Sequence, residues 1–332
     1  MLQIEQTNLL LEKTVNERVH HPQGEPLRLV DRIVSDFDFC TFHVSTAPEA
    51  KTTLIISLYV KCWDDLARYG ARAYLDSKYG RYPEITVAAA PEQGYNYTLA
   101  VDTGALGAHG DAAYVAEAVG DIALLKRHAM AAPFEQAFAR YDELAREYGN
   151  VDTYAEDVKA QLADEPVLVI KYRGHDEGIY IKPLFDRVTV IFSTVFQDET
   201  DKIFGKVFLQ EFVDARKRRV QNAPQVLYSH RDAPLDIAAL VPAAHNDNKG
   251  YVTLVLFPRH LLPHKREYCI THVQVFRDYF HYHIKCFKAY MHSRMRTRVK
   301  DFLKVLNRAK PDADDDDKTR KTATGRRFEQ RV

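Results

Sequence analysis

A regular spacing of apolar residues near the carboxyl end is the clearest pattern in this sequence. The spacing runs in steps of three or four residues, which places the side chains on one face of an α-helix. Neither proline nor glycine interrupts the pattern between residues 266 and 310. We therefore predict one long helix over about 266–310, which would extend over roughly 65 Å. Its apolar positions are Val273, Phe276, Phe280, Ile284, Phe287, Met291, Met295, Val299, Phe302 and Leu306.

The rest of the chain alternates between β-rich runs and helical patterns. In the first half, runs of β-branched and aromatic residues predict strands at 28–34, 39–44, 53–60 and 94–102. Helical spacing predicts an amphipathic segment at Ile4–Val19 and helices at 63–80 and 111–148. In the second half, strands are predicted at 167–173, 187–196, 203–212, 224–230 and 250–258.

The two halves end alike, because a strand beginning with glycine leads through a short loop into a long helix in each. These strands begin at Gly94 and Gly250, which are 156 residues apart. We interpret this likeness as an internal duplication. The predicted fold class is α+β, with two similar modules, each an antiparallel sheet with a packed helix, plus the long carboxy-terminal helix. The predicted domains are 1–150, 151–310 and a polar tail at 311–332, and the acidic segment 150–165 has the composition of a linker or insertion.

The formal net charge is zero because two oppositely charged halves cancel. Residues 1–165 hold 15 Lys and Arg against 26 Asp and Glu, whereas residues 166–332 hold 31 against 20. An electropositive half favours an anionic partner such as nucleic acid, lipid headgroups or an acidic protein surface. The alternative is a solvated face that only keeps the protein soluble.

The four cysteines, at 40, 62, 269 and 286, have no paired spacing. The amino terminus also lacks the basic region and apolar core of a signal peptide, so we expect a cytoplasmic protein. We expect no membrane insertion, because no stretch approaches the roughly 18 uninterrupted apolar residues of a membrane span.

The stretch FHYHIKC at 280–286 raises the question of a zinc site, because it holds two histidines and a cysteine. On a helix, His281 and His283 point roughly 200° apart and cannot reach one ion. Only His283 and Cys286 share a face, and two ligands are half of a structural zinc site. We therefore predict no metal and no cofactor.

Two further stretches are weak signals for an enzyme. GALGAHG at 104–110 has glycines at GxxGxxG spacing, which fits neither a dinucleotide fingerprint nor a phosphate loop, and we interpret it as a flexible connector. SHRDAPLD at 229–236 offers Ser, His and Asp, but no GxSxG elbow exposes a serine. We expect no catalytic activity.

The end of the long helix carries two different faces. Lys300, Lys304 and Arg308 recur in steps of four and lie about 100–180° around the axis from Val299. The apolar stripe needs a cover, for which a helix of a partner subunit is the natural candidate, and the cationic face suits an anionic surface. A helix that bends back onto its own domain is the alternative for the stripe.

Four long stretches of the second half resemble the actin-related protein 2/3 complex subunit 2 family, the large scaffold subunit of that complex. The first half resembles it more diffusely, and the segment around 141–165 and the aspartate run at 314–317 depart from it. The matching stretches are DRVTVIFSTVFQDETDKIFGKVFLQEF (186–212), APQVLYSHRDAPLD (223–236), GYVTLVLFPRH (250–260) and FRDYFHYHIKCFKAYMHSRMRTRVKDFLKVLNRAKPDA (276–313).

The resemblance implies a scaffold whose long helix pairs with subunit 4 to form the core of the complex. It also implies a place in the actin cytoskeleton, binding to the side of an actin filament and support for branched filament nucleation. The implied interface with the partner subunit is the apolar stripe from Phe276 to Leu306. A nucleic-acid-binding protein that uses the same basic helix is the competing interpretation. The implied filament-binding residues are Lys300, Lys304, Arg308, Arg326 and Arg327.

Overall fold

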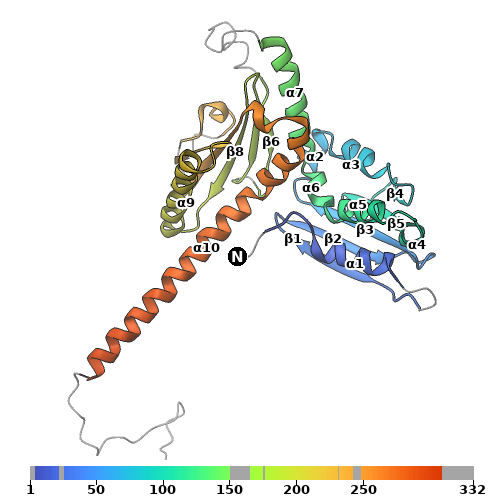
Figure 1. Ribbon diagram of the computed structural model, residues 1–332, viewed down its shortest axis with the longest axis horizontal. Coiled ribbons are helices and arrows are strands. Elements are labelled where there is room, and N and C mark those ends of the chain that lie inside the picture. Colours follow the sequence, from blue (N-terminus) through green and yellow to red (C-terminus); the bar gives the residue numbers. More distant parts are fainter. Residues whose placement is uncertain are drawn as a thin grey trace, which may run out of the picture. The chain divides into compact units, whose positions relative to one another are not determined.

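The computed structural model describes residues 4–21, 26–149, 165–174, 176–230, 232–241 and 248–308. These residues form two five-stranded antiparallel sheets, helices packed on them, and a long carboxy-terminal helix (Figure 1). The predicted α+β fold class is therefore confirmed. The predicted boundary near residue 150 and the tail from residue 311 lie outside the described residues.

The first module is built on a sheet with the strand order β1-β2-β3-β5-β4. Its strands alternate as their sequences predict: in β2, Cys40, Phe42 and Val44 are buried, and Thr41 and His43 between them face the other side. The strands are β1 (Asp31–Asp36), β2 (Cys40–Thr46), β3 (Thr53–Val60), β4 (Ile85–Val87) and β5 (Tyr97–Asp102).

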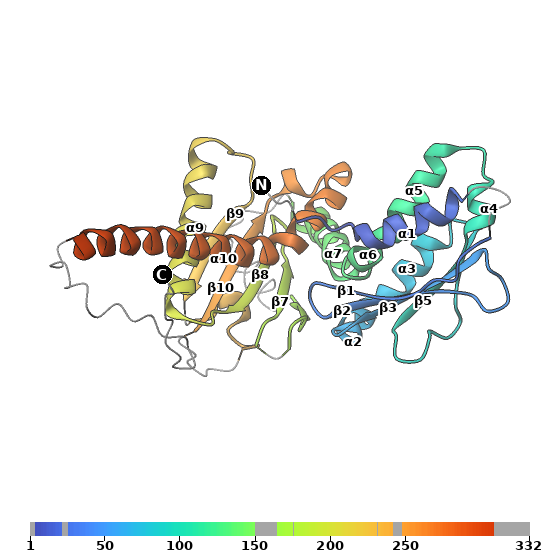
Figure 2. The same cartoon turned by 90° about the horizontal axis from the view of Figure 1, so that it is seen from below.

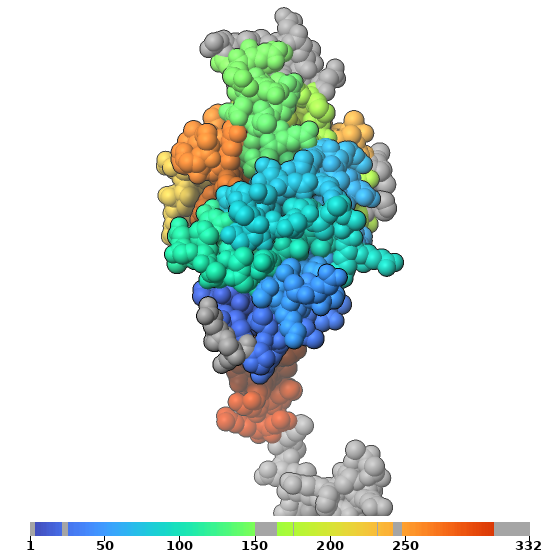
Figure 3. Space-filling view, turned by 90° about the vertical axis from the view of Figure 1, so that its right-hand side faces the viewer, coloured from blue at the N-terminus to red at the C-terminus, as the bar shows by residue number. Residues whose placement is uncertain are grey.

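Figure 2 shows helices of the first module, α1, α5 and α6 among them, on one side of this sheet. Figure 3 looks onto the same module, whose surface is formed by residues of the amino-terminal half, coloured blue to green. The helices are α1 (Leu9–Val19), α2 (Trp63–Arg68), α3 (Ala71–Tyr79), α4 (Thr103–Gly107), α5 (Ala112–Ala123), α6 (Leu125–Ala129) and α7 (Ala132–Tyr148).

The second module repeats the topology of the first, with the strand order β6-β7-β8-β10-β9. Strand by strand, β6 to β10 take the places of β1 to β5, which supports the interpretation of an internal duplication. The strands are β6 (Leu168–Ile170), β7 (Ile179–Pro183), β8 (Val188–Val195), β9 (Gln225–His230) and β10 (Lys249–Leu256). The helices are α9 (Glu199–Arg218), the short turns η1 (Leu235–Ile237) and η2 (Pro258–His260), and α10 (Pro263–Arg308).

Three predicted elements of the sequence differ from the structure. The helix predicted over 63–80 is two helices, α2 and α3, which are separated at Gly70, a residue with a φ of 82°. Residues 203–212 lie inside helix α9, because Phe204, Phe208 and Phe212 recur every four residues and this spacing outweighs their β-rich composition. The helix predicted over 111–148 is three helices, since the chain breaks at Leu124 and again before Pro133, which occupies the first turn of α7. The short strands β4 and β7 were not predicted.

The glycine-rich segment at 104–110 is also different from the predicted flexible connector. Residues 103–107 form helix α4, which Asp102 caps by accepting hydrogen bonds from the N–H groups of Gly104 and Ala105. A Cβ on Gly107 would lie 2.3 Å from the carbonyl oxygen of Val19. The glycine is needed there because α4 meets the end of α1 at backbone distance.

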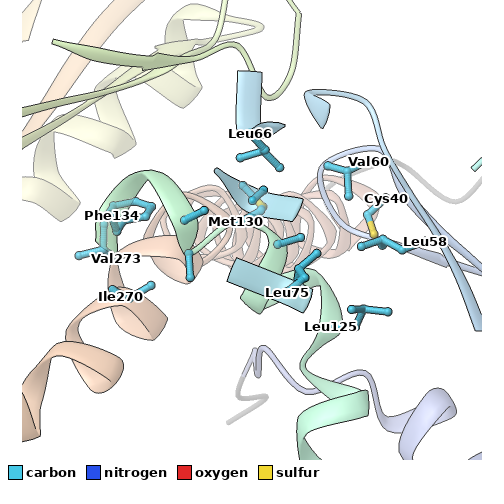
Figure 4. Packing of buried hydrophobic residues seen from close by; sticks show 14 of the residues in the cluster. Cys40, Leu58, Val60, Leu66, Leu75, Leu125, Met130, Phe134, Ile270 and Val273 are labelled. Carbon is cyan, nitrogen blue, oxygen red and sulfur yellow. The ribbon is translucent and has the colours of Figure 1, made fainter. Parts of the chain in front are cut away.

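One continuous hydrophobic core joins the two modules. Figure 4 shows its centre, where Leu58 of β3, Leu75 of α3 and Phe134 of α7 belong to the same cluster as Ile270 and Val273 of α10. The chain accordingly divides into one compact unit that ends at Ile284 and a second unit from Lys285 onward. In the ranges described, no helix is long and apolar enough to cross a membrane.

Candidate docking surface on helix α10

The amino-terminal half of α10 is fixed in the core of the first unit. The guanidinium of Arg127 in α6 is buried and donates to the main-chain oxygen of Glu267 (2.7 Å) and to the hydroxyl of Thr271 (3.2 Å). A carboxylate oxygen of Glu267 lies 2.6 Å from the same guanidinium. These contacts fix the start of α10 against the first module.

An aromatic cluster continues this attachment on the second module. The ring of Phe276 packs 5.9 Å from Phe192 of β8, and the ring of Phe280 packs 6.1 Å from Phe196 at the end of that strand. Phe208 of α9 lies 5.9 Å from Phe280 on the other side. Phe280 and Ile284 are almost fully buried, so the chain itself covers this part of the predicted partner interface.

A buried ionic cluster, which the sequence analysis did not predict, lies at the junction of the two modules. It holds three cations and four carboxylates: Lys126, Arg173 and Arg277 with Asp36, Asp38, Glu177 and Asp278. Arg277 contacts Glu177 at 2.9 Å, and Arg173 lies 3.0 Å from both Asp38 and Glu177. Lys126 lies 3.4 Å from Asp36 and 3.6 Å from Asp38. The only sequence signal was a charged pair, Arg277 and Asp278, next to the apolar stripe.

Burial and neighbouring charges shift the pKa values of two members of this cluster. Burial, followed by the neighbouring Asp38 carboxylate, raises the pKa of Asp278 to about 6. Burial lowers the pKa of Lys126, but Asp38 and Asp36 outweigh this effect and raise it. The fold therefore disfavours the charged form of the Asp278 carboxylate.

The histidines of FHYHIKC have contacts of their own. The Nε2 atom of His281 is 2.7 Å from the hydroxyl of Thr194, and the ring of His283 stacks 5.0 Å from Phe208. Cys286 is exposed. Among the residues that the structure describes, no group of three or more possible metal ligands was found. That FHYHIKC binds no zinc stays a prediction, which metal analysis of the purified protein would test.

Beyond Ile284 the character of α10 changes from buried to exposed. Every side chain from Met291 to Arg308 is exposed. The exposed part of the apolar stripe includes Met291, Met295, Val299, Phe302 and Leu306, whose side chains are 37% to 63% exposed. Phe287, also predicted at this interface, is 45% exposed. Because large exposed apolar side chains follow one face of the helix, this stretch is a candidate docking surface.

The cationic face lies on the same exposed stretch. It consists of Lys300, Lys304 and Arg308, all exposed. Lys304 contacts one carboxylate, that of Asp301 on its own helix at 3.5 Å, and in the described ranges no ion pair is found for Lys300 or Arg308. Arg326 and Arg327, the other predicted filament-binding residues, lie outside the described residues.

A duplicated α+β body whose carboxy-terminal helix exposes large apolar side chains is typical of a subunit of a larger protein assembly. Comparison with known proteins gives the particular family. Residues 56–313 match the family described as Arp2/3 complex, 34 kD subunit p34-Arc. The chain belongs to this family.

Two relatives extend the match over nearly the whole chain. The actin-related protein 2/3 complex subunit 2 of Schizosaccharomyces pombe is 46% identical over 329 residues, which cover 99% of this chain and 99% of the relative. The protein of the same name from Dictyostelium discoideum is 37% identical over 331 residues, which cover 99% of this chain and 100% of that relative.

Proposed function

We propose that this chain is a non-catalytic scaffold subunit of the actin-related protein 2/3 complex. In this proposal the apolar stripe pairs with a helix of subunit 4, and the cationic face lies against the side of an existing actin filament. The assembly then supports the nucleation of a branch. The family membership supports the place in the complex. The geometry of α10 supports the assignment of its two faces to two different partners.

One observation carries the proposal. The helix is fixed in its own core up to Ile284, and from Met291 onward it exposes five large apolar side chains along one side. Burying side chains of this size is worth about 1.5–3 kcal/mol each, so leaving the stripe in water would be costly. A partner helix with its own apolar stripe would cover it by ridges-into-grooves packing.

The cationic face can act independently because it points away from the stripe. Lys300, Lys304 and Arg308 lie about 100–180° around the helix from Val299, so a partner on the stripe leaves them accessible. Exposed charges contribute little to folding but strongly to the rate and specificity of association with an oppositely charged surface. An acidic filament surface would be recognised in this way.

Reversal of the three cations tests the filament role. The K300E/K304E/R308E variant should assemble into the complex normally, yet its attachment to filament sides and its branch formation should fall at least about tenfold, because like charges repel. Filament co-sedimentation and counting of branches would measure this loss.

The matched control reverses three exposed cations elsewhere, as K217E/R218E/R219E at the end of α9. It should bind filaments more tightly than the first variant. Equal losses of filament attachment in both variants would show that the net charge causes the effect. Normal branching by K300E/K304E/R308E would contradict the proposal. Tighter binding of the wild-type complex to duplex DNA than to filaments at physiological salt would favour the nucleic-acid interpretation instead.

A further inference from the structure

The edge strand β1 of the first sheet has an open row of backbone groups. Sheet pairing joins β1 to β2 only. The N–H of Thr46 in β2 donates to the carbonyl of Val30 at 2.8 Å, so the backbone of Val30 faces β2. Because the direction alternates along a strand, the N–H and C=O groups of Asp31, Ile33 and Ser35 face outward. In the parts of the chain that the structure describes, none of these groups has a hydrogen-bond partner.

The duplicated second module shows the same edge in a covered state. Its edge strand β6 is the counterpart of β1. The outward N–H of Val169 donates to the hydroxyl of Tyr69 at 2.8 Å, and that of Lys171 donates to a carboxylate oxygen of Asp65 at 2.9 Å. Both acceptors belong to or directly follow helix α2 of the first module. In the ranges that the structure describes, no side chain accepts from the outward N–H groups of β1 in this way.

An apolar hollow lies directly beside the open edge. Its volume is about 530 Å³, and its walls come from the segment before α1 and from the end of β1. The apolar side chains that line it are Ile4, Leu9, Leu10, Val34 and Phe37. Leu9, Leu10 and Phe37 are all more than half exposed, as is Ile33 on the strand itself. A long, exposed edge strand with apolar neighbours is prone to pairing with another chain.

We propose that the edge of β1 is a docking site for an extended segment of another subunit of the assembly, which adds a sixth strand to the first sheet. The backbone chemistry selects a strand rather than a helix. At β6, side chains accept from two outward N–H groups. Strand β1 presents outward donors and acceptors over six residues, and a strand backbone supplies partners for both at that spacing. The side chains of the segment that face the helices would be apolar, because they enter the hollow between Leu9, Leu10 and Phe37.

This inference rests on the proposed place in the complex, but no residue that lines the site belongs to the exposed stretch of α10 from Met291 to Arg308. The first test is amide hydrogen exchange over residues 31–36 in the assembled complex and in the isolated chain. The outward amides of Ile33 and Ser35 should exchange rapidly in the isolated chain and at least about tenfold more slowly in the complex. Equal exchange in both states would overturn the proposal.

Hydrogen exchange in the isolated chain also shows whether another segment pairs with the edge of β1. Protection that appears in the isolated chain and grows with its concentration would assign the edge to a second copy. Protection that is independent of concentration would assign it to the chain's own remaining residues. Either result would overturn the proposal of a different polypeptide.

A proline variant tests the backbone contact directly. Ser35→Pro removes one outward N–H while leaving the pairing with β2, a position where an edge strand tolerates proline. The exchange protection and the affinity of the docked segment should fall at least about tenfold, whereas Ser35→Ala, which keeps the N–H, should behave as wild type. If Ser35→Pro folds and assembles with unchanged protection at Ile33, no strand adds to this edge. If the Ser35→Pro variant does not fold, hydrogen exchange in the wild-type complex still tests the proposal.

Discussion

Single residues of this protein show that the same amino acid has opposite roles in different surroundings. Gly107 ends α4 against the backbone of Val19, where an added Cβ would lie 2.3 Å from a carbonyl oxygen. Gly120 lies inside α5, and nothing is within 4 Å of the position that its Cβ would take. The first glycine is required by packing, whereas the second only weakens its helix.

Alanine substitutions at these two positions should therefore change stability in opposite directions. Gly107→Ala should lower the free energy of unfolding by about 1–3 kcal/mol, because the backbone of α1 must move. Gly120→Ala should raise it by about 0.5–1 kcal/mol, because alanine is the better helix former. Denaturant titration of both variants would measure this, and a loss of stability in Gly120→Ala would show that α5 needs the glycine for another reason.

Asp278 provides a prediction of pH dependence. Burial and the Asp38 carboxylate raise its pKa from 3.8 to about 6, so between these values the folded chain holds a proton that the unfolded chain has released. The stability that this proton contributes is fully present below pH 3.8 and is lost as the pH rises through 6. Asp278→Asn removes this loss, and at pH 7.5 the variant should be more stable by up to about 3 kcal/mol.

The gain of Asp278→Asn should be small at pH 4, where wild-type Asp278 is already protonated in the folded chain. Thermal unfolding at pH 4 and pH 7.5 would separate the two cases, and the exposed Asp301→Asn serves as the control with no expected gain. An equal gain at both pH values would mean that packing, not ionisation, limits stability at this position.

At the scale of elements, α10 is one helix with two different environments. Its residues up to Ile284 form part of the core, and its residues from Met291 onward are exposed. The helix has no internal proline or glycine, so the change in burial occurs without a break in the backbone. One continuous helix thus has a buried part in the folded unit and an exposed part beyond it.

Phe302→Asp should block assembly through the apolar stripe. Loss of a buried phenylalanine costs about 1.5–3 kcal/mol, and the new charge adds a desolvation cost, so incorporation into the complex should fall at least about tenfold. The isolated variant should also self-associate less than wild type. Thr297→Asp is the matched control, because Thr297 lies about 160° from Val299 on the opposite side of the helix.

Co-purification with the other subunits and sedimentation of the isolated chains would measure these effects. Normal incorporation of the Phe302→Asp variant would show that the stripe is not the assembly interface. Equal losses for both variants would instead point to a general sensitivity of the helix to added acidic residues.

At the scale of the whole molecule, charge is divided between the halves of the chain. Residues 1–165 carry an excess of 11 acidic side chains and residues 166–332 an excess of 11 basic ones. Such a dipole leaves the net charge at zero but gives the second half a positive field. The cationic face of α10 is part of that half.

Salt should therefore separate the two proposed activities of the helix. Filament attachment should weaken several-fold as the ionic strength rises from about 0.05 M to 0.15 M, where the screening length falls to about 8 Å. Assembly through the apolar stripe should change little over the same range, because apolar burial does not depend on screening. Co-sedimentation with filaments and analytical sedimentation of the complex, both at several salt concentrations, would check this. A parallel weakening of both would contradict the assignment of separate faces.

The sequence by itself determined the features that depend on local periodicity. The 3.6-residue spacing from Val273 to Leu306 predicted α10, and β-rich runs located strands such as β3 and β8, because these patterns reflect which face of an element is buried. The repeated ending of the two halves predicted a duplication, and the shared strand order supports it. Composition without attention to spacing misassigned 203–212, whose phenylalanines lie on one face of α9.

Only the tertiary structure decided what covers each face. Periodicity predicted that Phe280, Ile284, Met295 and Phe302 share one apolar stripe, but it could not show that the first two are buried in the chain's own core and the last two are exposed. The ionic cluster around Asp278 was likewise invisible, since its members lie up to 242 positions apart, from Asp36 to Asp278. A sequence pattern specifies that a surface prefers to leave water, whereas the choice of neighbour depends on contacts between segments that are distant along the chain.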